Sequence, residues 1–234
     1  FGSSIFFLRG RRGVGAEEPG PRRGPPRSGA MSMDRLVELF LESARPEGER
    51  GTDAAPFGGG APDDEAIERG VEVVEKMMTS DDAIQMGSSP SATFVCLGMA
   101  MEEKPLLGGA SLRCYEKALH YLGRRAGRDG GGWERCVVLQ QMGAVGLRQG
   151  RYGDARAWLQ ECAEACAATP GHPRDADLYN GAFNTKQTRM EFAATIEKMR
   201  AQACARLGDT PRAHEHLAES QRLEALAAGD AVER

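Results

Sequence analysis

A three-residue pattern that occurs three times is the feature that most constrains the fold of this 234-residue chain. In each copy, a small residue is followed four positions later by a large one and three positions further on by another small one. These spacings place all three side chains on one face of an α-helix, where small residues let a neighbouring helix approach and the large residue fills the groove. The copies are Ser111, Tyr115 and Ala118; Ala155, Leu159 and Cys162; and Ala213, Leu217 and Ser220.

The turn in front of this pattern repeats as well. Gly150 and Gly208 each lie five residues before the alanine that opens the pattern. Glycine ends a helix in the left-handed conformation, and Pro211 suits the first turn of the helix that follows. On the upstream helix, Met142 and Gly143 supply a bulky residue beside a glycine, which permits close contact between helices. The sequence therefore predicts helix pairs joined by short turns.

Helical periodicity continues through most of the chain, and no segment shows the alternation typical of a half-buried strand. Only 6% of the residues are aromatic, whereas there are 30 glycines, a composition that suits stacked helices better than a β-sandwich or barrel. We therefore predict an all-α fold. The predicted helices of its main part span about 91–104, 110–124, 133–149, 153–168, 186–207 and 211–227.

The region before this main part divides by composition. Residues 1–32 are rich in arginine, proline and glycine, which predicts a disordered leader or, alternatively, an organellar targeting segment. If translation starts at Met31 or Met33 we expect a cytoplasmic protein, whereas a cleaved leader would indicate a mitochondrion or plastid. The remaining predicted units are a short amphipathic helix at 33–44, a flexible linker at 45–62, an N-terminal helix at 63–88 and a helical repeat domain at 91–227.

The repeated three-residue pattern and the turns in front of it resemble the tetratricopeptide repeat family. The pattern of that family, about 34 residues long, carries Leu-Gly on the first helix and Ala-x3-Phe on the second. In 136–169, the segment with the best match, Met142-Gly143 stands for Leu-Gly and Ala155-x3-Leu159 for Ala-x3-Phe. Segments 91–124 and 194–227 are similar to two further copies. The copies are offset by 44 and 58 residues, and Gly146 replaces an aromatic. A generic α-solenoid or helical bundle remains the alternative.

The resemblance implies a right-handed stack of antiparallel helix pairs, with the first helix of each pair lining a concave groove. In the family, this groove receives a peptide or helix from a partner protein. The matching positions in this chain are mildly basic and amide-rich, which suits an acidic or polar peptide. They are Met99, Glu102, Gln140, Gln141, Ala144, Arg148, Lys198, Gln202 and Arg206.

Members of the family that bind heat-shock chaperones clamp a C-terminal carboxylate with lysine, arginine and asparagine. The matching positions of this chain hold none of these residue types, so binding of a chaperone C-terminus is disfavoured. They are Val95, Met99, Gln141, Thr195 and Met199.

No arrangement of reactive side chains predicts catalysis, a metal site or a cofactor. Cys162-x3-Cys166 and His214-x-His216 lack the paired spacing of metal ligands. The chain has no phosphate-binding loop, dinucleotide fingerprint or nucleophile elbow. We therefore expect a non-enzymatic protein without cofactors, and we expect its six cysteines to be free thiols packed in the core.

The charge distribution further limits the partners. Residues 1–30 carry a net charge of +4 and the other 204 residues carry -8, so the main part repels phosphate backbones and disfavours nucleic-acid binding. No stretch approaches the roughly 18 apolar residues of a membrane helix. The leading hypothesis is a scaffold that binds another protein. The alternative is an assembly factor or structural subunit of a larger complex, because three repeats are the minimum for a stable stack. This complex would be organellar if the N-terminal segment is a targeting sequence.

Overall fold

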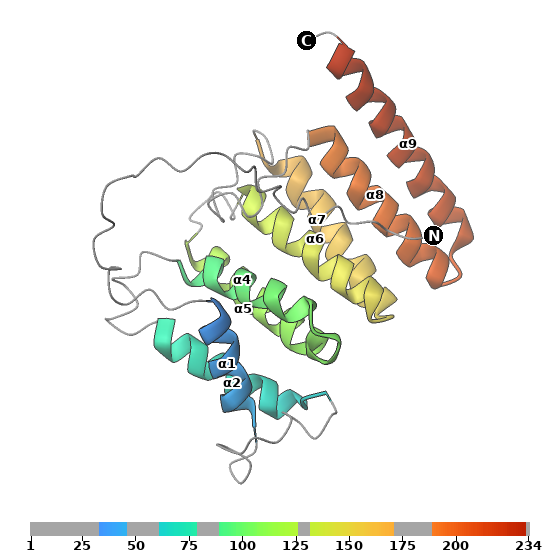
Figure 1. The fold of residues 1–234 in the computed structure, drawn as a ribbon. Coiled ribbons are helices and arrows are strands. Elements are labelled where there is room, and N and C mark those ends of the chain that lie inside the picture. Colours follow the sequence, from blue (N-terminus) through green and yellow to red (C-terminus); the bar gives the residue numbers. More distant parts are fainter. Residues whose placement is uncertain (1–32, 46–60, 79–88, 126–131, 171–188, 233–234) are drawn as a thin grey trace, which may run out of the picture. The chain divides into compact units, whose positions relative to one another are not determined.

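The computed structural model describes residues 33–45, 61–78, 89–125, 132–170 and 189–232, and within these ranges all regular structure is helical. This confirms the all-α prediction. The predicted leader and most of the predicted linker lie outside the described residues. The helices are α1 (Met33–Ala44), α2 (Asp64–Met78), α4 (Pro90–Glu102), the short 3-10 helix η3 (Pro105–Leu107), α5 (Gly108–Arg125), α6 (Gly132–Arg148), α7 (Tyr152–Ala168), α8 (Arg189–Arg206) and α9 (Thr210–Val232) (Figure 1).

Consecutive helices pack as pairs, and each pair packs on the next. The pairs are α1 with α2, α4 with α5, α6 with α7, and α8 with α9. Helix α1 contacts α4, α2 contacts α5, α5 contacts α6, and both α6 and α7 contact α8. The main contacts thus lie within a pair or between neighbouring pairs, which is the pattern of an α-solenoid-like arrangement. The two N-terminal helices, which we expected only to precede three pairs, form a fourth pair at the start of the stack.

Helices α1 and α2 meet where a phenylalanine lies on a glycine. Phe40 is fully buried, and a Cβ atom added at Gly70 would lie 2.6 Å from its ring. A side chain at position 70 would therefore push the ring out of place. The glycine stands on the second helix of this pair, whereas in α4/α5 and α6/α7 it stands on the first.

In those two pairs, a glycine on the first helix lies against the large residue of the repeated pattern. A Cβ atom added at Gly98 would lie 2.9 Å from the Tyr115 ring, and one added at Gly143 would lie 2.5 Å from Leu159. Tyr115 and Leu159 are fully buried, as the sequence predicts. For the third copy the prediction is wrong, because Leu217 on α9 is 41% exposed.

The last two pairs share one register between their helices. Cys162 donates a hydrogen bond to the backbone oxygen of Cys136 (3.1 Å), and Ser220 donates one to the backbone oxygen of Ala194 (2.9 Å). In each case the two residues are 26 positions apart, as are the ion-paired residues Arg135 and Glu161 and also Lys198 and Glu224. Helices α6 and α8 are therefore equivalent elements of two repeats that begin at residues 136 and 194.

The turns between these paired helices also close in the same way. Gly150 and Gly208 adopt φ values of 75° and 81°, the left-handed conformation that favours glycine. The backbone N–H of Arg151 donates to the oxygen of Gly146, and that of Asp209 donates to the oxygen of Cys204. Each of these bonds satisfies a carbonyl at a helix end, so the prediction of glycine-terminated turns is confirmed.

The half-buried carboxylate of Glu75 connects α2 to α5. Lys117 and Tyr121 each donate a hydrogen bond of 2.7 Å to Glu75. Burial alone would raise the pKa of Glu75, but the hydrogen bonds from Lys117 and Tyr121 and the positive charge of Lys117 outweigh it, so the pKa lies below its ordinary value.

We expect Glu75→Gln to lower the free energy of unfolding at neutral pH by about 1 kcal/mol, because the amide loses the charge-assisted bond from Lys117. A carboxyl group with a lowered folded-state pKa stabilises the fold above the unfolded value of about 4.3, and this contribution is lost as the pH falls through the folded pKa. Urea unfolding of both proteins from pH 7 to pH 3 measures the difference. The solvent-exposed Glu72→Gln is the control, and a difference for Glu75→Gln that persists in acid would contradict the prediction.

Candidate functional site

The predicted groove residues lie on the first helices of three successive pairs. Helix α4 carries Met99 and Glu102; α6 carries Gln140, Gln141, Ala144 and Arg148; and α8 carries Lys198, Gln202 and Arg206. Those on α4 and most of those on α6 are half-buried, whereas Arg148 and the three on α8 are exposed. The predicted residues thus follow one row of neighbouring helices.

The structure brings two of these residues together. Arg148 of α6 forms an ion pair with Glu102 of α4, and the other oxygen of that carboxylate accepts a hydrogen bond from Tyr115. Tyr115 is the large residue of the first repeated pattern, so Glu102 connects the core of one pair to the first helix of the next. The charge of Arg148 is compensated within the protein.

The remaining predicted cations also have partners. Lys198 forms an ion pair with Glu224 of α9. The guanidinium of Arg206 lies 6.0 Å from the ring centroid of Tyr152, the first residue of α7, in a cation–π arrangement. The predicted basic character of this half of the groove is therefore offset by neighbouring groups that the sequence pattern did not identify.

Near the middle of the row the surface is uncharged. Gln140, Gln141 and Ala144 are half-buried and occupy successive positions of one face of α6. Among the described residues, neither glutamine side chain has a hydrogen-bond partner. Each amide offers two donor hydrogens and an acceptor oxygen, which is the complement of a peptide backbone.

The six cysteines are free, and all but Cys96 are buried. Burial raises the pKa of the thiols of Cys96 and Cys114, which keeps them protonated. Cys162 lies in the core, as the repeated pattern predicts, and His216 contacts a carboxylate on α8 instead of joining His214. Within the described ranges, no three His, Cys, Asp or Glu side chains are placed to hold a metal ion together.

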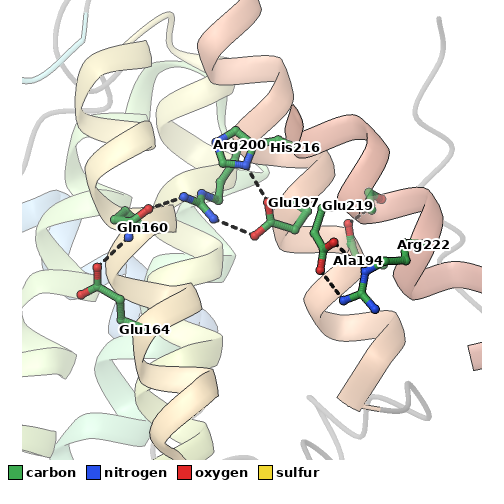
Figure 2. A network of polar contacts seen from close by, with 9 residues as sticks. Gln160, Glu164, Ala194, Glu197, Arg200, His216, Glu219 and Arg222 are labelled. Atoms are coloured by element: carbon green, nitrogen blue, oxygen red, sulfur yellow. Dashed lines mark hydrogen bonds and ion pairs between the residues drawn. The ribbon is translucent and has the colours of Figure 1, made fainter. Parts of the chain in front are cut away.

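A second polar arrangement, which the sequence analysis missed, joins α7, α8 and α9 (Figure 2). Glu197 of α8 lies at its centre. The Nη1 of Arg200 donates to one oxygen of this carboxylate at 2.7 Å, and the Nδ1 of His216 lies 2.7 Å from the other. Arg200 also donates to Gln160 on α7, and Gln160 donates in turn to Glu164 (2.6 Å). Glu197 is buried, with 9% of its surface exposed. Arg200 and His216 are half-buried, and Gln160 and Glu164 are exposed.

The repeat frames reveal why this arrangement is unusual. When the repeats that begin at residues 136 and 194 are aligned, Glu197 is equivalent to Leu139 and Arg200 is equivalent to Met142. Leu139 and Met142 are core residues, 0% and 2% exposed. Charged residues thus replace apolar ones at two core positions of the last pair, and comparing the two frames in the sequence would have found them.

A cleft of about 520 Å³ opens above Arg200, between α7 and α9. Three arginines and a histidine line it, together with one carboxylate; they are Arg156, Arg200, Arg212, His216 and Glu215. A smaller hollow of about 220 Å³ lies further along the same three helices. It is lined by three alanines, Cys166, Met190, Ile196 and Leu223 and by the charged residues Arg189, Glu197 and Glu219.

Fold and surface together define an α-solenoid-like stack of helix pairs with two candidate binding faces. No protein-family model matches the chain, and no curated protein matches it in sequence. None of the described helices combines the length and the apolar character that crossing a bilayer requires.

Proposed function

We propose that this protein is a non-catalytic interaction scaffold whose first helices, α4, α6 and α8, together receive a peptide or helix of a partner protein. The observation that carries this proposal is the common register of the last two pairs, in which helix positions 26 residues apart face each other. Equal register presents equivalent residues of successive first helices on one continuous surface, which is how stacked repeats bind extended partners. We therefore propose that the stack of helix pairs is a divergent tetratricopeptide-like array.

The charges of this face favour a polar peptide over a strongly acidic one. Arg148 and Lys198 are paired with carboxylates of the protein itself, so an acidic partner would have to displace those carboxylates. The side-chain amides of Gln140 and Gln141 are instead available, within the described part of the chain, to hydrogen-bond the backbone of a bound segment.

Affinity purification of the full chain followed by mass spectrometry identifies the partner, and substitution then tests the face. We expect Gln140→Ala combined with Gln141→Ala to weaken the purified complex by about tenfold, because two backbone-directed hydrogen bonds are lost. Gln221→Ala, at an exposed position of α9, is the control and should bind as the unaltered protein does. Unchanged affinity for the double variant would remove this face from the site.

A second candidate function, a structural subunit of a larger complex, is favoured by the surface of α9. Leu217 and Leu226 are both more than two-fifths exposed on this last described helix. A permanent partner that packs on α9 would cover these leucines. Size-exclusion chromatography of the native protein separates the two functions, because a subunit elutes in a complex of fixed stoichiometry and a scaffold exchanges with free protein.

A further inference from the structure

The cleft and the smaller hollow lie one after the other along α8, and we call the two together the α7–α9 groove. Helix α8 is its floor, and α7 and α9 are its walls. Along the floor the groove runs from Met190 to Cys204, and 14 helical steps of 1.5 Å give it a length of about 21 Å. About six extended residues or four helical turns of a bound segment would span this length.

One end of the groove is basic. Arg156 is exposed and has no ion-pair partner among the described residues, and Arg212 is 62% exposed, with its nearest carboxylate, that of Asp209, 3.6 Å away. Below them, the Nε of Arg200 is buried without a hydrogen-bond partner although both terminal nitrogens of its guanidinium are bonded. Glu215 is the single carboxylate in the lining of this end. Arginines in this arrangement recognise carboxylates through charge-assisted hydrogen bonds.

The other end of the groove is mainly apolar, although Arg189, Glu197 and Glu219 also reach its edge. Ile196 on the floor is almost fully buried, and Leu223 of α9 closes one side. Three alanines also line this end, among them Ala163 and Ala193, and their short side chains leave space for a larger apolar group. A groove with this division selects for a segment that carries charge at one end and apolar side chains at the other.

The polar floor is a departure from the packing of this chain's own repeats. A leucine and a methionine at positions 197 and 200 would pack as Leu139 and Met142 do, without the cost of burying charges. Natural sequences break such packing rules mainly where function requires it. The network formed by Glu197, Arg200 and His216 holds the Arg200 guanidinium at the base of the cleft.

We infer that the α7–α9 groove binds a segment of a partner protein that has two or more carboxylates followed by apolar side chains. The carboxylates contact Arg156 and Arg212 at the rim, above the Arg200 guanidinium that Glu197 and Gln160 already hold, and the apolar side chains occupy the alanine-lined end. This site is separate from the proposed face on α4, α6 and α8. Two residues correspond to a rotation of about 200° around the helix axis, so Arg200 and Lys198 lie on opposite faces of α8.

A selection from a random 12-residue peptide library on the immobilised full chain tests this inference. Peptides that bind elsewhere are first removed by passing the pools over the variant Arg156→Glu combined with Arg212→Glu. Both altered side chains are exposed, so this variant should keep its fold, and far-UV circular dichroism checks this. We expect the remaining peptides to be enriched in Asp and Glu next to Leu, Ile or Phe. The synthesised consensus peptide should bind this variant at least about tenfold more weakly than the unaltered protein.

Two controls make the outcome decisive. Arg35→Glu combined with Lys76→Glu changes the net charge equally on exposed positions of α1 and α2 and should leave the affinity unchanged. Gln140→Ala combined with Gln141→Ala should also leave it unchanged, which separates this site from the proposed function. The inference is overturned if depletion leaves no binding peptides or if the consensus lacks acids. It is equally overturned if single-stranded RNA or inorganic phosphate, and not the peptide, depends on Arg156 and Arg212.

Discussion

Replacing Gly143 with leucine is expected to lower the free energy of unfolding by about 3 kcal/mol. Even the first carbon of a side chain at this position would lie 2.5 Å from Cδ2 and 2.6 Å from Cγ of Leu159, closer than packed carbons approach. Leu159 has no room to move, because it is fully buried in the contact between α6 and α7. Urea unfolding followed by circular dichroism measures the loss.

Two further variants establish the cause of this loss. Leu159→Ala alone should also destabilise, by about 2 to 5 kcal/mol, but combined with Gly143→Leu it should cost less than the sum because the new side chain fills the space. Gly123→Leu is the matched control, since nothing lies within 4 Å of a Cβ atom at that helical position. There the higher helix propensity of leucine should be neutral or stabilising. Equal losses at positions 123 and 143 would show that close packing is not the reason.

Replacing Glu197 with leucine is expected to lower the free energy of unfolding by about 3 to 5 kcal/mol. The substitution leaves the partly buried Arg200 without its carboxylate and removes the partner of His216. Combining it with Arg200→Met should restore most of the stability, because the pair then matches Leu139 and Met142 of the preceding repeat. Thermal and urea unfolding of the two variants provide the test.

The double variant also separates stability from binding. If the polar floor exists for recognition, a protein with leucine at 197 and methionine at 200 keeps most of the stability of the unaltered protein but loses affinity for the acidic peptide. Arg200→Met alone, which leaves Glu197 bonded to His216, shows how much affinity depends on the guanidinium itself. A double variant as unstable as Glu197→Leu would mean that the two repeats do not share equivalent core positions.

The sequence was sufficient to predict the helix pairs whose contacts recur at fixed spacing. Gly143 and Leu159 could be paired because both belong to a pattern that appears more than once, and such a pattern reports packing directly. The contact of Phe40 with Gly70 could not be predicted in this way, because it occurs once and places the glycine on the other helix of the pair. The pair α1/α2 was therefore expected only as two separate helices.

The predicted groove residues show a different limit. The sequence identifies Arg148 and Lys198 as cations on first helices, but the effective charge depends on Glu102 and Glu224, which lie 46 and 26 residues away. Glu197 could not be identified from its residue type, because a glutamate is expected at the surface of a helix. Only its equivalence to a core position of the preceding repeat indicates that it is buried. Partners in space, and not residue types, decide the charge of both faces.

The constant distance of 26 residues within the last two pairs has a consequence for how such a chain can change in length. Hydrogen bonds and ion pairs fix the distance inside a pair, whereas the unequal offsets of 44 and 58 residues show that the distance between pairs varies. Doubling the length of a flexible connection costs only about 0.6 kcal/mol, so insertions there are nearly neutral. Repeats that start at unequal intervals can therefore keep one surface intact. Relatives of this chain are best sought by the spacing inside a pair, with connections of any length allowed between pairs.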